Sequence, residues 1–212
     1  MFGAGPLLFA LFARGERWLF PALWLWAGVC LLVLLTDRTF ERRRLWSTRG
    51  LRRELRPMLA RFAVLGLGIT ALVLAITPRE AFGLPRRDPT LWAAIMVLYP
   101  LVSVYPQEVI FRAFFFHRYA GLLRGRWAMI GASAVAFGWA HIVFQNAVSI
   151  PMTLIGGALF SLTYERSRSV FAASVEHALY GCLVFTVGLG HYFYDGSARR
   201  DAPPAHVEVS DQ

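Results

Sequence analysis

The sequence contains no lysine, so all 22 of its basic residues are arginine. It has only two cysteines, Cys30 and Cys182, which lie far apart within apolar stretches. This spacing argues against a disulfide framework or a cysteine-rich zinc site. Charged residues make up only 17% of the chain, whereas hydrophobic residues make up 57%. Such a composition is too apolar for an ordinary soluble domain and indicates a membrane protein.

The net charge of +9 could reflect nucleic-acid binding, but the pattern of the charges argues against it. A nucleic-acid binder gathers its basic residues on an exposed face among other polar residues. Here the arginines fall between apolar runs, as they do in cytoplasmic loops and at membrane surfaces. We therefore expect contacts with membrane lipid and none with nucleic acid.

A transmembrane helix needs about 20 mostly apolar residues, and the sequence contains six candidate segments. These are residues 18–36, 59–77, 91–117, 127–148, 150–164 and 170–194. Pro100 and Pro106 interrupt the third segment, and the short fifth one contains Gly156 and Gly157. The pattern predicts an all-α fold, a polytopic transmembrane helical bundle of about six spans.

Loop charges predict the orientation of this bundle. The segment 37–58 carries eight arginines, and the loops near residues 118–126 and 166–168 are also basic. With six spans, all three loops fall on one side, and the positive-inside rule makes that side cytoplasmic. We therefore expect a multi-pass protein of the inner cell membrane, with both termini outside.

The sequence divides into three parts. Residues 1–89 carry the first membrane helices and the Arg-rich loop, and residues 90–195 carry the remaining spans. Residues 196–212 are polar and contain prolines, a composition typical of a mobile tail. Glu108, Arg112, His141 and His177 lie in the middle part, so we expect the chemistry of the protein to be there.

Three of the apolar segments carry ionisable side chains that stand out, because charges inside a membrane are costly and usually tied to function. Glu108 and Arg112 are in the third segment, His141 is in the fourth and His177 is in the sixth. A glutamate followed four residues later by an arginine is the favoured order for an ion pair on one helix face. A simple membrane anchor needs none of these groups. They predict an active site inside the membrane.

Small residues are concentrated in the fourth segment, where they would let neighbouring membrane helices approach closely. Tight packing there would hold His141 in a defined position. The residues concerned are Gly131, Ala132, Ser133, Ala134, Ala136, Gly138 and Ala140.

A carboxylate and a histidine that meet in a dry cavity can activate a water molecule by removing its proton. A second histidine can donate a hydrogen bond to the oxyanion that forms when water attacks an amide. An arginine can hold the carboxylate charged and oriented. Glu108, His141, His177 and Arg112 are the residues that supply these groups.

At these residues the chain resembles the CAAX-protease and bacteriocin-processing membrane peptidases, also called the CPBP or Abi family. The family has three motifs: Glu-Glu-x-x-x-Arg, Phe-x-x-x-His, and a histidine followed four residues later by asparagine or an apolar residue. The resemblance covers about residues 90–195. The matching segments are Gln107-Glu108-Val-Ile-Phe-Arg112, Phe137-Gly-Trp-Ala-His141 and His177-Ala-Leu-Tyr-Gly181.

The resemblance implies a glutamate-dependent intramembrane endopeptidase. In such an enzyme, the glutamate of the first motif and the histidine of the second activate water. The histidine and asparagine of the third motif stabilise the oxyanion. The resemblance implies no metal cofactor, and a substrate that is a membrane-tethered or transmembrane protein or a peptide precursor.

Two residues depart from the family pattern. Gln107 stands where the family has its first glutamate, and an amide cannot accept a proton at neutral pH. Adjacent helical residues point about 100° apart, so Glu108 is not a simple replacement. Gly181 stands in place of the oxyanion asparagine, and loss of one such donor costs about 3 kcal/mol of transition-state stabilisation. Asn146 is a candidate to compensate.

Plainer interpretations exist for each residue. Glu108 and Arg112 could form a structural ion pair, and both histidines could be satisfied core residues. Glu176 could tune His177 or face a cytoplasmic water pocket. The position of Glu108 toward the Arg-rich end of its span implies a cytoplasmic entrance to the site.

Three functions are compatible with the sequence. The first is an intramembrane endopeptidase in which Glu108 and His141 activate water. The second is a non-catalytic relative that binds or protects a membrane partner, as Gln107 and Gly181 suggest. The third is a metallopeptidase with zinc on Glu108, His141 and His177, although no His-Glu-x-x-His segment arranges two of these ligands in advance.

Overall fold

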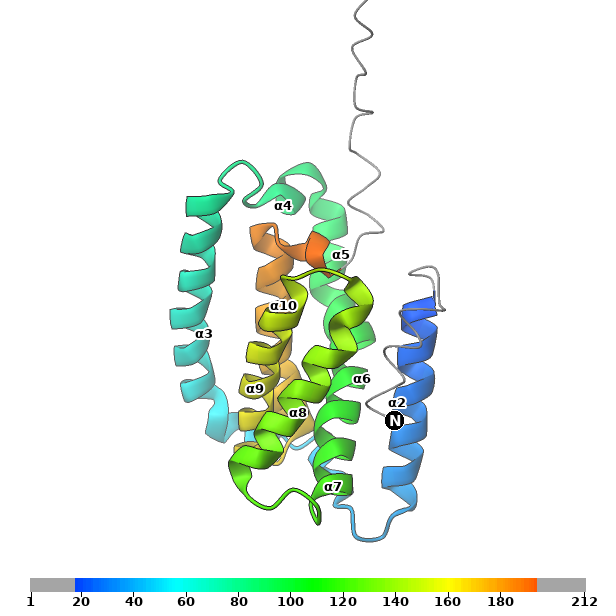
Figure 1. The fold of residues 1–212 in the computed structure, drawn as a ribbon. Helices are drawn as coiled ribbons and strands as arrows, with labels where there is room; N and C mark the ends of the chain where they lie inside the picture. The colour runs from blue at the N-terminus through cyan, green and yellow to red at the C-terminus, as the bar shows by residue number, and fades with distance from the viewer. Residues whose placement is uncertain (1–17, 194–212) are drawn as a thin grey trace, which may run out of the picture.

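The structure, a computed structural model, describes residues 18–193 and contains no strand in that range (Figure 1). The predicted C-terminal tail, residues 196–212, lies outside the described residues. The helices are α2 (Leu19–Thr36), α3 (Thr48–Ile76), α4 (Gly83–Arg87), α5 (Pro89–Tyr99), α6 (Tyr105–Glu108), α7 (Phe115–Tyr119), α8 (Arg126–Ala140), α9 (Ser149–Ser167) and α10 (Val170–Val187).

Within residues 18–193, six antiparallel passes make up the bundle, which confirms an all-α transmembrane fold of about six spans (Figure 1). Five stretches of this described range are long and apolar enough to cross a membrane, and α5 to α7 form one of them, Pro89–Tyr119. The sixth pass is α9, whose 19 residues reach about 28 Å at 1.5 Å per residue. It lies outside the apolar set, and its sequence carries several serines and threonines.

The three basic turns gather at one end of the bundle, which we call the Arg-rich end (Figure 1). The Ser169 hydroxyl donates to the Ser47 carbonyl over 2.7 Å, which joins the turn after α9 to the turn before α3. His117 Nε2 lies 2.8 Å from Asp37 Oδ2 and joins α7 to the end of α2. Hydrogen bonds from His117 and Thr39 lower the pKa of Asp37 to about 2. The predicted clustering of the basic loops is confirmed.

One boundary differs from the sequence prediction. We expected residues 37–58 to be a loop, but α3 begins at Thr48 and includes the second half of this segment. Arginine is a good helix former, and its long side chain can carry its charge to the membrane surface while the backbone stays helical. The apolar pattern alone therefore placed the start of this helix too late.

Helices α8 and α9 pack closely, as the small residues of the fourth segment predicted. A Cβ atom on Gly157 of α9 would lie only 3.0 Å from the Cα atom of Ala134 of α8. A Cβ on Gly138 would lie 2.7 Å from two side-chain atoms of Leu154. Glycine at these points lets the two backbones approach, and this fixes the end of α8 where His141 follows.

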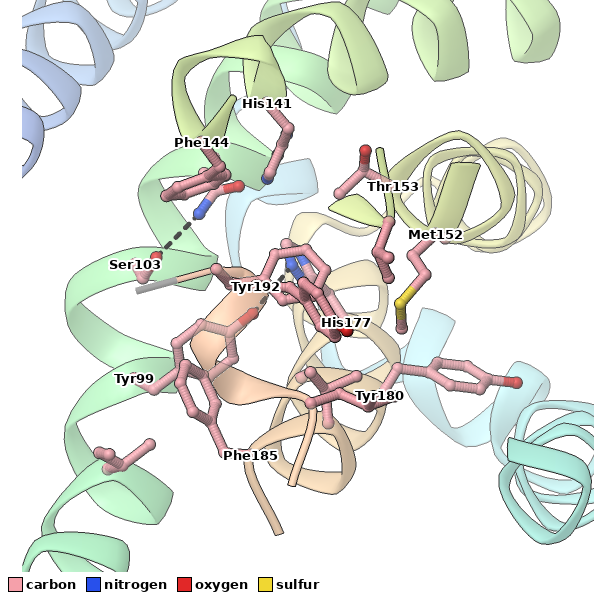
Figure 2. Close-up of a pocket in the computed structure, with 18 of the residues that line it drawn as sticks. Tyr99, Ser103, His141, Phe144, Met152, Thr153, His177, Tyr180, Phe185 and Tyr192 are labelled. Carbon is pink, nitrogen blue, oxygen red and sulfur yellow. Dashed lines mark hydrogen bonds between the residues drawn. The ribbon is translucent and has the colours of Figure 1, made fainter. Parts of the chain in front are cut away.

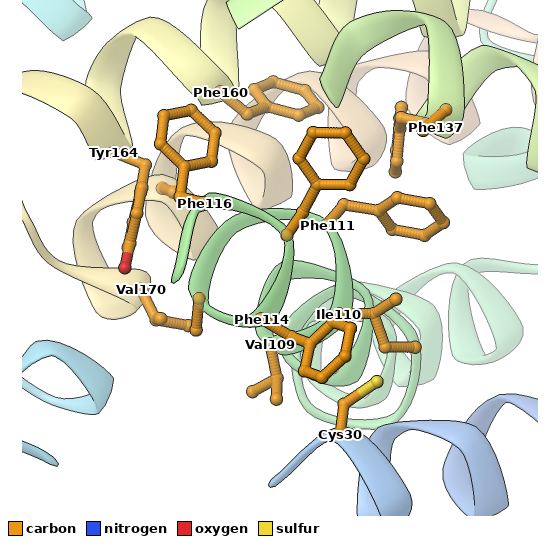
Figure 3. Packing of buried hydrophobic residues seen from close by; sticks show 14 of the residues in the cluster. Cys30, Val109, Ile110, Phe111, Phe114, Phe116, Phe137, Phe160, Tyr164 and Val170 are labelled. Atoms are coloured by element: carbon orange, nitrogen blue, oxygen red, sulfur yellow. The ribbon is translucent and has the colours of Figure 1, made fainter. Parts of the chain in front are cut away.

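Aromatic side chains of the third pass fill the core of the bundle (Figure 3). The three consecutive phenylalanines 114–116 are all buried, each with 6% exposure, and so form packing surface. Phe116 packs edge to face on Tyr164 of α9, with ring centroids 5.0 Å apart, whereas Phe114 lies on the side of Cys30 of α2 (Figure 3). Large apolar side chains of α2 and α3 are instead exposed, as expected for helices that face lipid.

Candidate active site

The third pass is irregular where it carries the polar motif. Two wide π-helical turns, η3 (Pro100–Val104) and η4 (Val109–Phe114), flank the single turn of α6. Pro106 has no N–H, so it cannot bond the carbonyl of Val102 four residues earlier. That carbonyl instead accepts a hydrogen bond from Trp24 Nε1 of α2 over 3.0 Å. Pro106 therefore leaves this carbonyl available to a side chain of another helix.

Gln107 and Glu108 are neighbours that face different surroundings. Gln107 is partly exposed, lines a cavity, and donates from Nε2 to the Ser103 hydroxyl over 2.8 Å. Glu108 is fully buried and is not among the residues that line this cavity. The helix therefore presents an amide to the cavity and keeps the carboxylate behind it.

The buried carboxylate of Glu108 meets two basic side chains. Its Oε2 lies 3.2 Å from Nε of Arg112, so the i,i+4 ion pair predicted from the sequence is confirmed. Its Oε1 lies 2.9 Å from Nδ1 of His177 on α10. Glu108 thus connects the first motif to the third, although the two residues are 69 positions apart.

Arg112 is fully buried and rests in a polar and aromatic niche. One terminal nitrogen donates to the Ser133 hydroxyl over 3.2 Å, and Ser133 donates in turn to the Phe111 carbonyl over 2.7 Å. The guanidinium carbon lies 5.0 Å from the centre of the Phe137 ring, a cation–π arrangement. Phe137, the first residue of the second motif, therefore also contacts the arginine. Removal of Glu108 would leave this charge buried without its counter-ion.

His177 is held on three sides. Its Nδ1 faces Glu108, its ring stacks on Phe160 with centroids 4.4 Å apart, and its Nε2 lies 3.2 Å from the Tyr99 hydroxyl. An ionised carboxylate only accepts hydrogen bonds, so Nδ1 carries the proton on that side. In the neutral ring, Nε2 then accepts from the Tyr99 O–H.

His141 follows the last residue of α8 and opens the turn η5 (His141–Phe144). Its Nδ1 lies 2.7 Å from the carbonyl of Phe137, one of the carbonyls that the end of the helix leaves free. A carbonyl can only accept, so Nδ1 carries the proton and Nε2 of the neutral ring is left as a base. The fold therefore selects the tautomer of this histidine.

A cavity of about 1560 Å³ brings the polar residues together (Figure 2). Gln107, His141 and His177, one residue from each motif, all line it. Phe137 and Gly181 of the second and third motifs line it as well. Most of the remaining wall is apolar, formed by side chains of α2, α3, α5, α9 and α10. The sequence did not show that the motifs converge, and the structure places them around one space.

The cavity extends away from the Arg-rich end, which corrects the expected entrance. Its wall includes Glu80 and Asp88 from the turns around α4, and Val148 from the turn before α9. His191 and Tyr192, which follow α10, also line it. All of these segments lie at the end of the bundle opposite the Arg-rich turns (Figure 1). The position of Glu108 along its helix was a poor guide because Glu108 does not face the cavity.

Asn146 has a different role from the compensating donor expected of it. Its Nδ2 donates to the carbonyls of Tyr192 over 2.7 Å and Phe144 over 3.3 Å, so both N–H groups are used. Its Oδ1 accepts from the backbone N–H groups of Val148 and Ser149, which caps the start of α9. Asn146 holds the turn after His141 in place.

Glu176 also turns away from the site. Its carboxylate accepts two hydrogen bonds from Arg61 of α3, over 2.9 and 3.1 Å, and one from Thr163 of α9. It ties three helices together, and neither of the roles weighed for it describes this contact. Its pairing with Arg61, which is 115 residues away, could not be predicted from local spacing.

Tyr99 is a site residue that the motifs did not reveal. It is the last residue of α5, lines the cavity and bonds His177. A tyrosine in an apolar run resembles an ordinary packing or interfacial residue. Only the folded structure shows that the Tyr99 ring lies against Gly181 of the third motif.

The segment that carries the three motifs matches a known protein family. Residues 89–183 match a family described as Type II CAAX prenyl endopeptidase, Rce1-like. This segment is therefore similar to that family. The matched range begins at the start of α5 and ends two residues after Gly181, so it contains all three motifs, although it is less than half of the 212 residues. No curated protein and no solved structure matched the chain.

The match confirms the resemblance to the CPBP family that the three motifs indicated. An Rce1-like segment in a multi-pass helical bundle supports a membrane protease in general terms. Among residues 18–193, no three His, Cys, Asp or Glu side chains form a group that could hold a metal ion. Glu108 and His177 meet, but His141 makes its contact with a backbone carbonyl instead.

Proposed function

We propose that the protein is an intramembrane endopeptidase that hydrolyses a peptide bond of a membrane-associated protein or peptide precursor. The observation that carries this proposal is the convergence of Gln107, His141 and His177 on one largely apolar cavity. Cavities of this kind, with few polar groups on an apolar wall, are the usual form of ligand sites. The apolar wall suits a substrate segment that comes from the membrane.

His141 is the group best placed to activate water. Its ring lines the cavity, and because Nδ1 is bonded to the Phe137 carbonyl, Nε2 is the nitrogen that can accept a proton. In the proposed step, Nε2 takes a proton from water as the water oxygen attacks the carbonyl carbon. The same proton then passes to the leaving nitrogen as the C–N bond breaks. The Gln107 amide, steadied by Ser103, lies on the same wall and can orient the water through its oxygen.

In this mechanism Glu108 positions His177 and is not the base, which refines the hypothesis made from the sequence. Each of its oxygens already faces a basic group, Arg112 or His177. A direct role with water would require one of these buried pairs to separate. We propose that Glu108 fixes the orientation of His177 and that Arg112 keeps the carboxylate charged. The mechanism uses no metal, and stoichiometric zinc in purified protein would favour the metallopeptidase alternative instead.

The test is a comparison of protein termini in membranes from cells that carry wild-type protein or the His141→Ala variant at matched expression. We expect a set of new termini with the wild type. Their abundance should fall by at least about 10²-fold in the variant, which is the usual contribution of a general base. These termini would establish proteolysis and identify the substrate in one measurement.

His117→Gln is the matched control, because His117 lies outside the cavity and contacts Asp37 at the Arg-rich end. It should leave the new termini unchanged. Identical termini for wild type and His141→Ala, with both proteins inserted and folded, would reject the proposal. The favoured reading would then be a non-catalytic relative that binds a membrane partner, for which Gln107 and Gly181 are the supporting residues.

We also propose that the Arg-rich end faces the cytoplasm of a cell whose inner membrane holds the protein. Because the cavity extends to the opposite end, the substrate would then reach the site from the outer face or from within the bilayer. With Cys30 and Cys182 replaced by alanine, single cysteines at Glu80 and at Arg124 should be modified by a membrane-impermeant thiol reagent only at position 80 in intact cells. Modification of position 124 alone would reverse the assignment.

A further inference from the structure

The position of Tyr99 beside Gly181 bears directly on how the cavity could stabilise negative charge. An ideal Cβ atom on Gly181 would lie 2.4 Å from the Tyr99 hydroxyl oxygen and 2.3 and 2.6 Å from two ring carbons. Real Cβ atoms do not approach other atoms so closely. The phenol of Tyr99 therefore occupies the space in which any side chain at position 181 would begin.

The Tyr99 ring is held in that space by its neighbours. Phe185 packs on it edge to face, with ring centroids 5.3 Å apart and planes at 69°. The Tyr99 hydroxyl lies 3.2 Å from His177 Nε2 (Figure 2). Tyr99, His177 and Gly181 all line the cavity. The ring thus brings a polar hydrogen to the cavity wall at the point where the third motif lacks its asparagine.

His177 itself has no proton to offer the cavity in its neutral form. Its single N–H is on Nδ1 and is directed at Glu108, so Nε2 is an acceptor. An oxyanion that forms at this wall needs a donor, and the ring cannot supply one. The Tyr99 O–H can, because a hydroxyl hydrogen rotates about its C–O bond to suit its partner.

We propose that the Tyr99 hydroxyl is the hydrogen-bond donor to the oxyanion in this site, and that the lack of a side chain at Gly181 makes room for it. The inference rests on the proposed peptidase function. Before attack, the O–H donates to His177 Nε2. As the carbonyl oxygen of the substrate gains charge, the O–H turns to that oxygen with little movement of the ring. No covalent bond to Tyr99 forms or breaks.

The first test is Tyr99→Phe, which removes the hydroxyl and keeps the ring. Cleavage of the substrate identified by the terminus comparison should fall by about 10²- to 10³-fold in kcat, with KM little changed, as for loss of one oxyanion donor. A control at the same wall is Phe185→Leu, which disturbs the packing of Tyr99 but removes no donor and should cost far less.

The second test exchanges the two positions. Gly181→Asn alone should inactivate the protein, because the new side chain overlaps the phenol. Tyr99→Ala combined with Gly181→Asn removes the overlap and supplies an amide donor, so it should recover activity above Tyr99→Ala alone. Tyr99→Ala combined with Gly181→Ala fills part of the same space without a donor and should recover none.

The outcomes separate this inference from the function on which it rests. Wild-type protein that produces no new termini would overturn the proposed function and this inference with it. Wild-type cleavage that Tyr99→Phe leaves intact would overturn the inference alone. Equal recovery of activity by the two double variants would show that Tyr99 acts by filling space, which also overturns it.

Discussion

Replacing Gln107 with glutamate is expected to raise the cleavage rate by about 10²-fold, within the usual range for an added general base. Gln107 lines the cavity with His141, whereas the native carboxylate of Glu108 lies behind the wall. The variant would therefore place a proton acceptor where the water is expected to bind. Ser103 can donate to the new carboxylate as readily as it now accepts from the amide, so the local contact can be kept.

The measurement is single-turnover cleavage of the identified substrate by Gln107→Glu and wild type, with Gln145→Glu as a control that adds the same charge outside the cavity wall. A gain confined to Gln107→Glu would show that the native amide limits the rate. Loss of cleavage would instead show that the site is adapted to a neutral group at this position, and it would contradict the expected gain.

Replacing Glu108 with alanine is expected to destabilise the fold by about 3–5 kcal/mol, the cost of leaving one partner of a buried ion pair uncompensated. Both side chains are fully buried, and Arg112 has no other carboxylate as an ion-pair partner among the residues that the structure describes. His177 would lose the acceptor on its Nδ1 at the same time. The free energy of unfolding in mixed detergent micelles measures this loss.

A second variant separates charge from packing. Glu108→Gln combined with Arg112→Met removes both charges at similar volume and should recover much of the stability that Glu108→Ala loses. Glu41→Ala is the matched control, because Glu41 pairs with Arg44 on the surface and its side chain is 69% exposed. Surface pairs are worth at most about 1 kcal/mol. A double variant no more stable than Glu108→Ala would show that the charges are not the cause.

Local rules predicted the features that depend on neighbours in the sequence. The ion pair of Glu108 with Arg112 follows from helical spacing, and the six passes follow from apolar length. The motif order also indicated the family match over residues 89–183. Each of these features is decided within one helix or by one short pattern.

The contacts that define the site depend on the fold and could not be predicted in this way. Glu108 meets His177 across 69 positions, and Tyr99 meets His177 across 78. The π-helical turns around α6 change the direction of side chains relative to a regular helix. The placement of Gln107 at the cavity and Glu108 in the interior depends on this geometry. The sequence alone placed the entrance at the Arg-rich end, whereas the cavity extends toward the opposite end.

The overlap between Tyr99 and position 181 restricts the order in which a lineage can change these residues. A side chain gained first at position 181 meets the phenol, because even a Cβ would lie 2.4 Å from its oxygen. A small residue gained first at position 99 leaves an opening beside His177 that a later change at 181 can fill. A lineage that starts from Tyr99 and Gly181 can therefore gain a side chain at position 181 only after it has lost the tyrosine.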